Sequence, residues 1–330
     1  MSYKHLSLEE RHYITNSIKN GKSINKISKE LNRSQSTISR ELYRNTGERG
    51  YRYKQANGLA IEKRRRSKTP TKLTSDVVKV IEDNIKKDWS PEQIAGILKK
   101  RGKISLHHET IYRFILKDKD NGGNLYTHLR HQNKTYRKRY GNARSRSGIP
   151  NRVDIDERPE EANNRERIGN WEADTIIGHN HKGAVVTLDE RVTKIRFSYP
   201  LNRRLAISVR DSIISMLTLV KAHVKSITFD NGKEFTLHEG IAKELDCDTY
   251  FAKPYHSWER GQNENANGLL RQYFPKAMEL IDIPIKTVVD AVDKLNSRPR
   301  KCLGYKTPYE AFEAATGITR DTILGYALTM

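Results

Sequence analysis

Three acidic side chains, far apart along the chain, have the type and setting needed to bind a divalent metal ion. Asp174 lies in NWEADTIIGH, Asp230 in TFDNGKEF and Glu264 in SWERGQNENANGLL. Carboxylates that converge repel one another and are costly to bury unless a cation holds them. Magnesium prefers oxygen ligands, and two such ions about 3.5–4 Å apart can act on a phosphodiester. The three acids therefore predict metal-dependent chemistry on a phosphate backbone.

The sequence around these acids predicts an α/β domain that could bring them together. Strands are predicted at 170–179, 185–190, 194–201, 225–232 and 247–255, and helices at 205–222, 238–246 and 257–275. Three consecutive strands followed by alternating helices and strands indicate a mixed five-stranded sheet flanked by helices. Asp174 falls inside the first strand, Asp230 ends the fourth, and Glu264 lies on the helix after the fifth. If the first and fourth strands are neighbours, the helix can bring Glu264 over both Asp side chains.

The first half of the chain carries the whole net charge of +21. Residues 1–150 hold 35 Lys and Arg against 14 Asp and Glu, whereas residues 151–330 hold 26 of each. This imbalance predicts a polyanion-binding arm on an ordinary globular domain. The start has no apolar signal region and no run approaches the ~18 apolar residues of a membrane span. Two cysteines, Cys247 and Cys302, suggest a reducing compartment. We expect a cytoplasmic protein whose partner is nucleic acid, not a membrane.

Residues 5–45 predict three short helices in a helix-turn-helix pattern. Ser7 followed by Glu10 forms a capping box, and further serines precede the second and third helices. In this fold the N-terminal residues of the third helix contact base edges in the major groove. The candidates lie opposite the inward-facing Ile38 and Leu42, and they are Gln35, Ser36, Ser39 and Arg40. A small bundle with a solvated polar face is the alternative, but the charge imbalance favours DNA binding.

A second helical module is predicted at 73–117. SPEQ (90–93) combines a capping box with a proline at the first helical position, which is a strong helix start. SLHHETIYRFILK (105–117) would be its third helix. His107 and His108 diverge by about 100° on a helix and have no cysteine partners, so we interpret them as polar surface and not as zinc ligands.

Three segments resemble the catalytic signatures of DDE transposases of the insertion-sequence-thirty family. They are WEADTI, TFDNGKEF and YHSWERGQNENANGLLRQYFP. Asp230 and Glu264 are separated by 33 residues, the interval that is characteristic of the family. Arg271 follows Glu264 by seven residues, where the family also carries a basic residue. The resemblance spans nearly the whole chain, because the helix-turn-helix modules match as well.

This resemblance implies an RNase H-like core that uses Mg2+ or Mn2+, two ions in our interpretation, to cut and join DNA. It makes Asp174, Asp230 and Glu264 the metal ligands and places Arg271 on a terminal phosphate or base. The N-terminal modules would bind the terminal inverted repeats of an insertion element, and a 3′-hydroxyl would attack target DNA without a covalent protein–DNA intermediate. Because two ends must be handled together, we expect a homo-oligomer on double-stranded DNA, in the bacterial cytoplasm and associated with the nucleoid.

The predicted organisation is multidomain, with all-α modules followed by the α/β core. The domains are a helix-turn-helix domain (1–46), a basic linker (47–70), a second helix-turn-helix-like domain (71–120), a second basic linker (121–165), the RNase H-like catalytic domain (166–315) and a C-terminal tail (316–330). Within the catalytic domain, LGYKTPYEAF (303–312) predicts a closing helix packed on the core.

Several residues near the acids leave alternatives open. Glu172 is two residues from Asp174 and shares its strand face, so it is the alternative metal ligand. Asp189 and Glu190 are interpreted as hairpin turn residues. His256 could approach the metal centre, although a lone histidine is more often a structural hydrogen-bonding group. Further interpretations are core packing for Trp171 and Trp258, and a sharp turn at Asn231 and Gly232 that aims Asp230.

Three other functions compete with a DDE transposase. A DNA-binding regulator with a decayed catalytic core would keep the helix-turn-helix modules but leave DNA uncut. A tyrosine or serine recombinase would form a covalent link to DNA. A retroviral-type integrase shares the chemistry, but its paired His and paired Cys zinc module has no counterpart near the start of this sequence.

Overall fold

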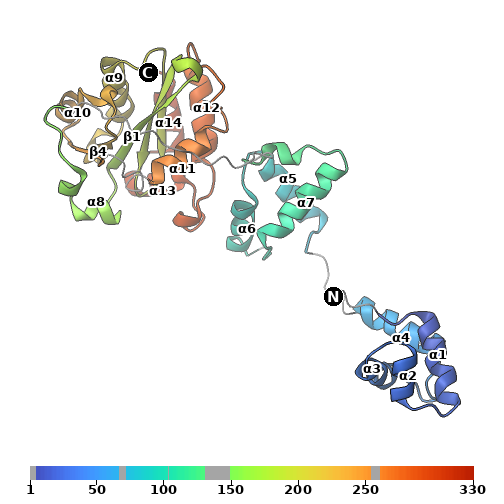
Figure 1. The fold of residues 1–330 in the computed structure, drawn as a ribbon. Coiled ribbons are helices and arrows are strands. Elements are labelled where there is room, and N and C mark those ends of the chain that lie inside the picture. Colours follow the sequence, from blue (N-terminus) through green and yellow to red (C-terminus); the bar gives the residue numbers. More distant parts are fainter. Residues whose placement is uncertain (1–4, 67–71, 103, 131–148, 254–260) are drawn as a thin grey trace. The chain divides into compact units, whose positions relative to one another are not determined.

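The computed structural model describes residues 5–66, 72–102, 104–130, 149–253 and 261–330. The chain forms two compact units, Met1–Lys72 and Leu73–Met330, which are described separately. Figure 1 shows a purely helical N-terminal unit, and a second unit in which a helical module precedes an α/β core. Among the described residues, no helix combines the length and apolar character needed to cross a bilayer.

The N-terminal unit contains the three predicted helices and one more. They are α1 (Leu8–Lys19), α2 (Ile24–Glu30), α3 (Gln35–Asn45) and α4 (Tyr53–Arg66) (Figure 1). Ser7 and Glu10 form the predicted reciprocal capping box at the start of α1. Ile14, Ile27 and Ile38 are fully buried and join the first three helices in one small core. The helix-turn-helix prediction for residues 5–45 is therefore confirmed.

Helix α4 lies in the segment 47–70, where we expected a basic linker. Its Ala56 is fully buried, and Asn57 accepts a hydrogen bond of 3.0 Å from the Arg11 guanidinium of α1. The rings of His12 and Tyr53 also meet, 4.7 Å apart between centroids. The sequence did not reveal this helix because its end is rich in Lys and Arg. Such side chains suit the solvated face of a helix as well as a flexible basic linker.

The second helical module consists of α5 (Ser75–Ile85), α6 (Pro91–Lys100) and α7 (His108–Asp120), as predicted. A reciprocal capping box of Ser90 and Gln93 begins α6. His107 is the N-cap of α7, where its imidazole accepts a hydrogen bond from the Glu109 amide. This histidine thus has a local structural role. The expected second linker, 121–165, includes the short helices Leu125–His128 and Glu160–Asn164 (α8), and its residues 131–148 lie outside the described residues.

The core is built on a mixed five-stranded sheet in the order β3-β2-β1-β4-β5. The strands are β1 (Asn170–Ile177), β2 (Ala184–Glu190), β3 (Arg196–Leu201), β4 (Ser226–Phe229) and β5 (Asp248–Phe251). β1, β2 and β3 pair in antiparallel fashion, and β4 and β5 run parallel to β1. The predicted sheet is confirmed, and β1 and β4 are neighbours as the prediction for the acids requires.

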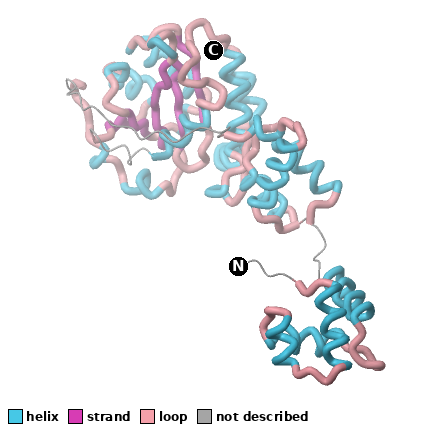
Figure 2. Tube along the Cα trace, turned by 45° about the vertical axis from the view of Figure 1, so that its right-hand side comes forward, coloured by secondary structure: helices cyan, strands magenta, loops and turns pink. Residues whose placement is uncertain are grey.

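Helices cover both faces of this sheet, which appears as a magenta layer between cyan helices in Figure 2. They are α9 (Ala206–Thr218), α10 (His238–Leu245), α11 (Gly261–Leu270), α12 (Ile285–Asn296), α13 (Pro308–Thr316) and α14 (Arg320–Ala327). One face buries Trp171 with Phe197 and Phe312, in the same cluster as the inward residues of α9 and α10. The other face buries Ile176 with residues of α11 and α12. The two apolar layers fix α11 beside β1.

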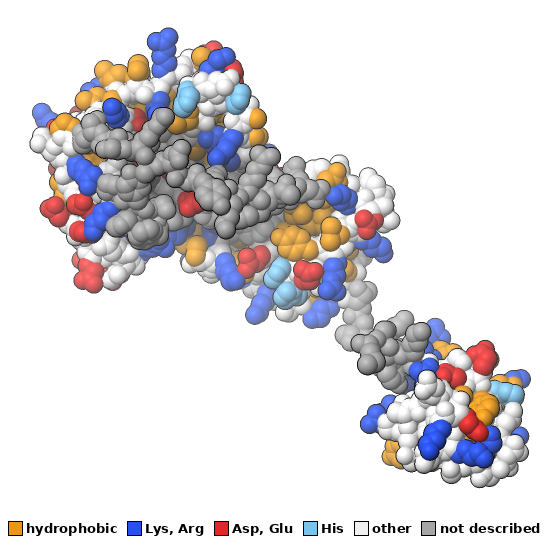
Figure 3. All heavy atoms as spheres, in the orientation of Figure 1, with side chains coloured by type: hydrophobic (Ala, Val, Ile, Leu, Met, Phe, Trp, Pro, Cys, Tyr) orange, Lys and Arg blue, Asp and Glu red, His pale blue; other side chains and the backbone are white. Residues whose placement is uncertain are grey.

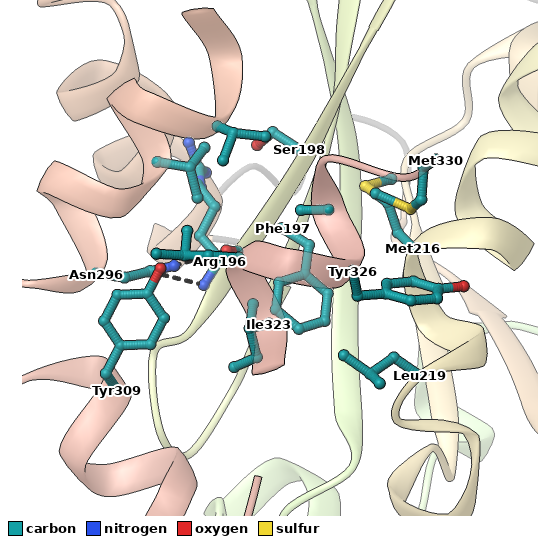
Figure 4. A pocket seen from close by; sticks show the side chains of 14 residues that line it. Arg196, Phe197, Ser198, Met216, Leu219, Asn296, Tyr309, Ile323, Tyr326 and Met330 are labelled. Atoms are coloured by element: carbon teal, nitrogen blue, oxygen red, sulfur yellow. Dashed lines mark hydrogen bonds between the residues drawn. The ribbon is translucent and has the colours of Figure 1, made fainter. Parts of the chain in front are cut away.

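The C-terminal residues 316–330, expected to form a tail, instead include α14. Arg320 pairs with Asp293 of α12 at 2.8 Å, and the Tyr326 hydroxyl donates to the Ser215 carbonyl of α9. A small apolar pocket remains where α14 meets the edge strand β3, lined by residues that include Phe197, Met216, Leu219, Ile323, Tyr326 and Met330 (Figure 4). Helix α14 therefore packs on the edge of the sheet. The closing helix predicted in 303–312 is present as α13.

Candidate active site

Asp174 lies in β1, and Asp230 directly follows the neighbouring parallel strand β4. The register of this pair sets Glu172 opposite Thr228, and if it continued for two more residues it would set Asp174 opposite Asp230. Adjacent strands are about 4.8 Å apart, and residues two apart on a strand share one face of the sheet. Both side chains are partly exposed. The topology thus sets the segments of two of the three predicted acids side by side, and Asp174 lies on the face covered by α11.

The Asp174 carboxylate accepts hydrogen bonds from the backbone of its own strand and from a side chain of α11. Its Oδ1 accepts from the Thr175 amide and its Oδ2 from Nδ2 of Asn267, both at 2.8 Å. Asn267 lies on α11, and its own Oδ1 accepts from the Arg196 guanidinium at 2.9 Å. Strand β1 and helix α11 are therefore joined directly at the candidate site.

Asp230 lies in a tight turn that follows β4. Its Oδ1 accepts from the Gly232 amide at 2.8 Å, and Nδ2 of Asn231 donates to the Ala252 carbonyl at 2.7 Å. A Cβ on Gly232 would come within 2.4 Å of the Glu234 carboxylate and 2.8 Å of Oδ1 of Asp230. A side chain here would therefore displace the Glu234 or Asp230 carboxylate, whereas the φ angle of −73° is open to any residue. The predicted turn is therefore present at Asn231, and its role in aiming Asp230 stays a prediction.

Glu234 is a buried acid next to this turn whose role the sequence did not reveal. It accepts hydrogen bonds from the Thr175 hydroxyl at 2.9 Å and from Arg204 at 3.0 Å. It therefore links the Asp230 turn to β1. The only sequence signal was its position in TFDNGKEF, four residues after Asp230.

Glu264 lies in the first turn of α11 and its side chain is exposed. Among the residues that the structure describes, no three His, Cys, Asp or Glu side chains lie close enough to hold a metal ion. Asp174 and Asp230 belong to neighbouring segments, β1 and the turn after β4, whereas Glu264 does not complete a three-ligand group with them. His256 and Trp258 lie outside the described residues.

The other acids of the core are engaged in structural contacts. Glu172 is 1% exposed and pairs with Arg191 at 2.8 Å. Asp189, interpreted from the sequence as a turn residue, is instead buried within β2 and binds the Arg196 guanidinium through both carboxylate oxygens. Glu190 ends β2 and accepts hydrogen bonds from the amides of Val192 and Thr193. The turn itself starts one residue later, at Arg191. The turn interpretation of Asp189 was wrong because strand pairing with Glu172 extends to this position.

Arg271 is half-buried and binds the protein backbone. Its guanidinium donates to the Ile177 carbonyl at 2.9 Å and to the Phe274 carbonyl at 3.4 Å. Burial lowers the pKa of Arg271 below its usual value. These contacts hold the C-terminal end of α11 against the end of β1. A contact between Arg271 and DNA remains a prediction.

The four predicted DNA-reading side chains, Gln35, Ser36, Ser39 and Arg40, are all exposed on α3. Tyr43, which the sequence analysis did not single out, is 90% exposed on the same helix. It follows Ser39 by four residues and Arg40 by three, so it extends the same face. Lys and Arg side chains are distributed over the N-terminal unit in the view of Figure 3. An unusually exposed tyrosine on this face is a further candidate for contact with DNA.

Comparison with known proteins gives matches along the whole chain. A helix-turn-helix domain model matches residues 2–45, and a homeodomain-like domain model matches residues 37–115. Among solved structures, the chain is similar to the catalytic core domain of BIV integrase, with 24% identity, a TM-score of 0.34, and coverage of 44% of this chain and 95% of that chain. It is also similar to a chain of the simian T-cell lymphotropic virus intasome, with 16% identity, a TM-score of 0.37, and coverage of 47% and 56%.

Relatives of known identity cover nearly all of the sequence. The transposase for insertion sequence element IS4351 of Bacteroides fragilis is 43% identical over 312 residues, covering 94% of this chain and 96% of that protein. Transposase InsI for IS30A of Escherichia coli K12 is 33% identical over 328 residues, covering 96% and 85%. The transposase for IS1086 of Cupriavidus metallidurans is 33% identical over 321 residues, covering 93% and 94%. The chain belongs to the insertion-sequence-thirty family of transposases.

Proposed function

We propose that this transposase cuts and joins DNA with Asp174, Asp230 and Glu264 as ligands for divalent metal ions. The observation that supports this most directly is that Asp230 directly follows β4, the strand that pairs in parallel with the β1 of Asp174. The donor atoms are carboxylate oxygens, which suit Mg2+ or Mn2+. Glu264 lies three residues before Asn267, the α11 residue that binds Asp174. If the first turn of α11 moved toward the end of β4, Glu264 would complete the set of three metal ligands. A bound cation would favour this movement because it offsets the mutual repulsion of the acids.

The site would hydrolyse and then transfer phosphodiester bonds. Two bound ions would supply activation of the attacking oxygen and stabilisation of the leaving oxygen. Water would first break the bond at each element end and expose a 3′-hydroxyl. That hydroxyl would then attack a target phosphodiester, so that one P–O bond forms as another breaks and no protein–DNA bond is needed. The ends could first be joined to each other, and the choice of target could be selective.

DNA would be captured by the helix-turn-helix modules. The exposed face of α3, with Gln35, Ser36, Ser39 and Arg40, would read the terminal repeats, and we add Tyr43 to this face. Lys and Arg side chains of the basic half would bind phosphates, which position the protein without reading sequence. Handling two ends at once would require a homo-oligomer. This function places the protein on DNA in the bacterial cytoplasm.

A metal-dependent strand-transfer assay on element-end DNA tests this function. With Mg2+ or Mn2+, the purified protein should nick the end and join its 3′-hydroxyl to a second duplex. A protein–DNA adduct that survives denaturation would instead support a tyrosine or serine recombinase.

A DNA-binding regulator is the second candidate, and one observation favours it: Glu264 does not complete a three-ligand group with Asp174 and Asp230. Protein that shifts end DNA in a gel but leaves it uncut with either metal would establish the regulator and contradict the transfer mechanism.

A further inference from the structure

We propose that Asn267 is a positioning residue that holds Asp174 in its metal-binding orientation and couples it to the helix of Glu264. This inference rests on the proposed function of the acids. Nδ2 of Asn267 donates to Oδ2 of Asp174 at 2.8 Å. Glu264 lies three residues earlier on α11, and residues at this spacing neighbour each other on a helix surface. One side chain therefore connects a ligand on β1 with the helix that carries another.

The orientation of the Asn267 amide is dictated by its two partners. Its Oδ1 accepts from the Arg196 guanidinium at 2.9 Å, and the Thr187 hydroxyl lies 3.4 Å from the same atom. A guanidinium can only donate hydrogen bonds, and an ionised carboxylate can only accept them. A flipped amide would lose both contacts. Asn267 is thus fixed with its NH2 group toward Asp174.

Arg196 is itself anchored within the sheet. It is 3% exposed and binds both oxygens of Asp189, at 2.8 and 2.5 Å. Its backbone exchanges two hydrogen bonds with the side chain of Asn296 on α12. Bidentate, charge-assisted pairs of this kind are strong and geometrically specific. Arg196 is therefore a rigid base for the contact to Asn267.

Arg196 also holds helix α11 directly. Its Nη1 donates to the Ala266 carbonyl at 3.0 Å, one residue before Asn267. The series Asp189, Arg196, Asn267 and Asp174 thus runs from β2 and β3 through α11 to β1. Partners that orient metal ligands are worth about 10–100-fold in metal affinity or activity. We expect this series of residues to orient Asp174. Docking of α11 does not depend on it alone, because Leu270 packs with Ile176 and with apolar residues of α12.

Two variants of Asn267 separate positioning from folding. Asn267→Ala removes the amide. Asn267→Asp keeps the shape and the acceptor for Arg196 but replaces the donor that faces Asp174. The matched control is Asn202→Ala, because Asn202 makes an equivalent amide-to-carboxylate contact with Asp282 on the exposed surface, also at 2.8 Å. Full-length proteins would be compared by strand transfer, Mn2+ titration calorimetry without DNA, thermal unfolding and gel shift of end DNA.

We expect both Asn267 variants to lose about 10–100-fold in strand transfer. Asn267→Ala should lose a similar factor in Mn2+ affinity, with end binding unchanged and the Asn202→Ala control matching wild type. If Asn267→Ala unfolds, Asn267→Asp carries the test, because Arg196 retains its partner. Transfer by Asn267→Asp within about twofold of wild type, or unchanged Mn2+ affinity in folded Asn267→Ala, would overturn the inference. If the wild type is inactive but its Mn2+ affinity still falls in Asn267→Ala, the proposed transfer reaction alone would be contradicted.

Discussion

Two acids of the core are paired with buried guanidinium groups: Glu172 with Arg191, and Asp189 with Arg196. A carboxylate bound to arginine is a poor ligand for a further cation. Asp174 accepts hydrogen bonds from neutral donors, the Thr175 amide and Asn267. The pairing of Glu172 with Arg191 therefore argues against Glu172 as the alternative metal ligand.

Glu172→Gln should destabilise the protein without abolishing strand transfer. The change removes the carboxylate paired with the buried Arg191 guanidinium, which we expect to cost about 3 kcal/mol in free energy of unfolding. Urea unfolding and strand transfer per folded molecule would be measured together. Unchanged stability with lost transfer would mean that Glu172 is a metal ligand after all.

The Lys194 side chain should make the free energy of unfolding depend on pH. Burial, followed by the nearby Arg165, lowers the pKa of Lys194 to about 8. Between pH 8 and the usual lysine pKa, the folded state therefore binds fewer protons than the unfolded state. Below pH 8 the charged, half-buried Lys194 lowers the free energy of unfolding, and this penalty disappears as the pH rises. Lys194→Met should be more stable at pH 7, by about 1 kcal/mol after allowance for partial exposure, and the gain should shrink toward pH 10.

Urea unfolding of Lys194→Met at pH 7 and at pH 9.5 would measure this change. Lys243→Met is the control, because Lys243 is exposed on α10. A gain that is constant with pH, or equal to that of the control, would contradict the assignment.

At the scale of elements, helix α4 should contribute to the stability of the helix-turn-helix unit. Gly58 lies inside α4, and a Cβ there would meet nothing within 4 Å. Gly58→Ala should stabilise the helix by about 0.5–1 kcal/mol, whereas Ala56→Asp would bury a charge and detach α4 from α1. Hydrogen exchange of the α1–α3 amides should slow in the first variant and accelerate in the second. A flexible linker would show neither effect.

Local signals in the sequence predicted most elements of this fold. Capping residues such as Ser7, Ser90 and Pro91 set helix starts, and β-favouring runs identified the five strands. The positions of α4 and α14 were missed, because their stability comes from packing on distant residues such as Arg11 and Asp293. The roles of Glu172 and Asp189 were hidden for the same reason, since their cationic partners become visible only when the strands pair.

The net charge divides the molecule into a basic half and an electrically neutral half. The excess positive charge of 21 lies within residues 1–150. In the remaining residues, acids and bases balance and several form buried pairs. Phosphate contacts give salt-dependent affinity for any DNA, whereas base contacts give preference for one sequence. The basic half should therefore capture DNA broadly, with α3 adding specificity.

Two substitutions should separate these contributions. Gln35→Ala should weaken binding to end DNA by about 1–3 kcal/mol and leave binding to random DNA unchanged, since it removes a base contact. Arg65→Ala, at the exposed end of α4, should weaken both equally and reduce the salt dependence by about one phosphate contact. Titrations at several salt concentrations would measure both effects. Equal losses for the two DNAs with Gln35→Ala would remove α3 as the reading helix.

Strand transfer by Asp230→Asn tests the central claim most directly. The substitution keeps the size of the side chain and a possible acceptor for the Gly232 amide, but removes the charge that would bind the cation. Asp211→Asn, at an exposed position on α9, is the matched control. Metal ions supply several kcal/mol, so Asp230→Asn should lose on the order of 10³-fold in Mg2+ or Mn2+ while still binding end DNA. Transfer by Asp230→Asn within a few-fold of the control would contradict the assignment of Asp230 as a metal ligand.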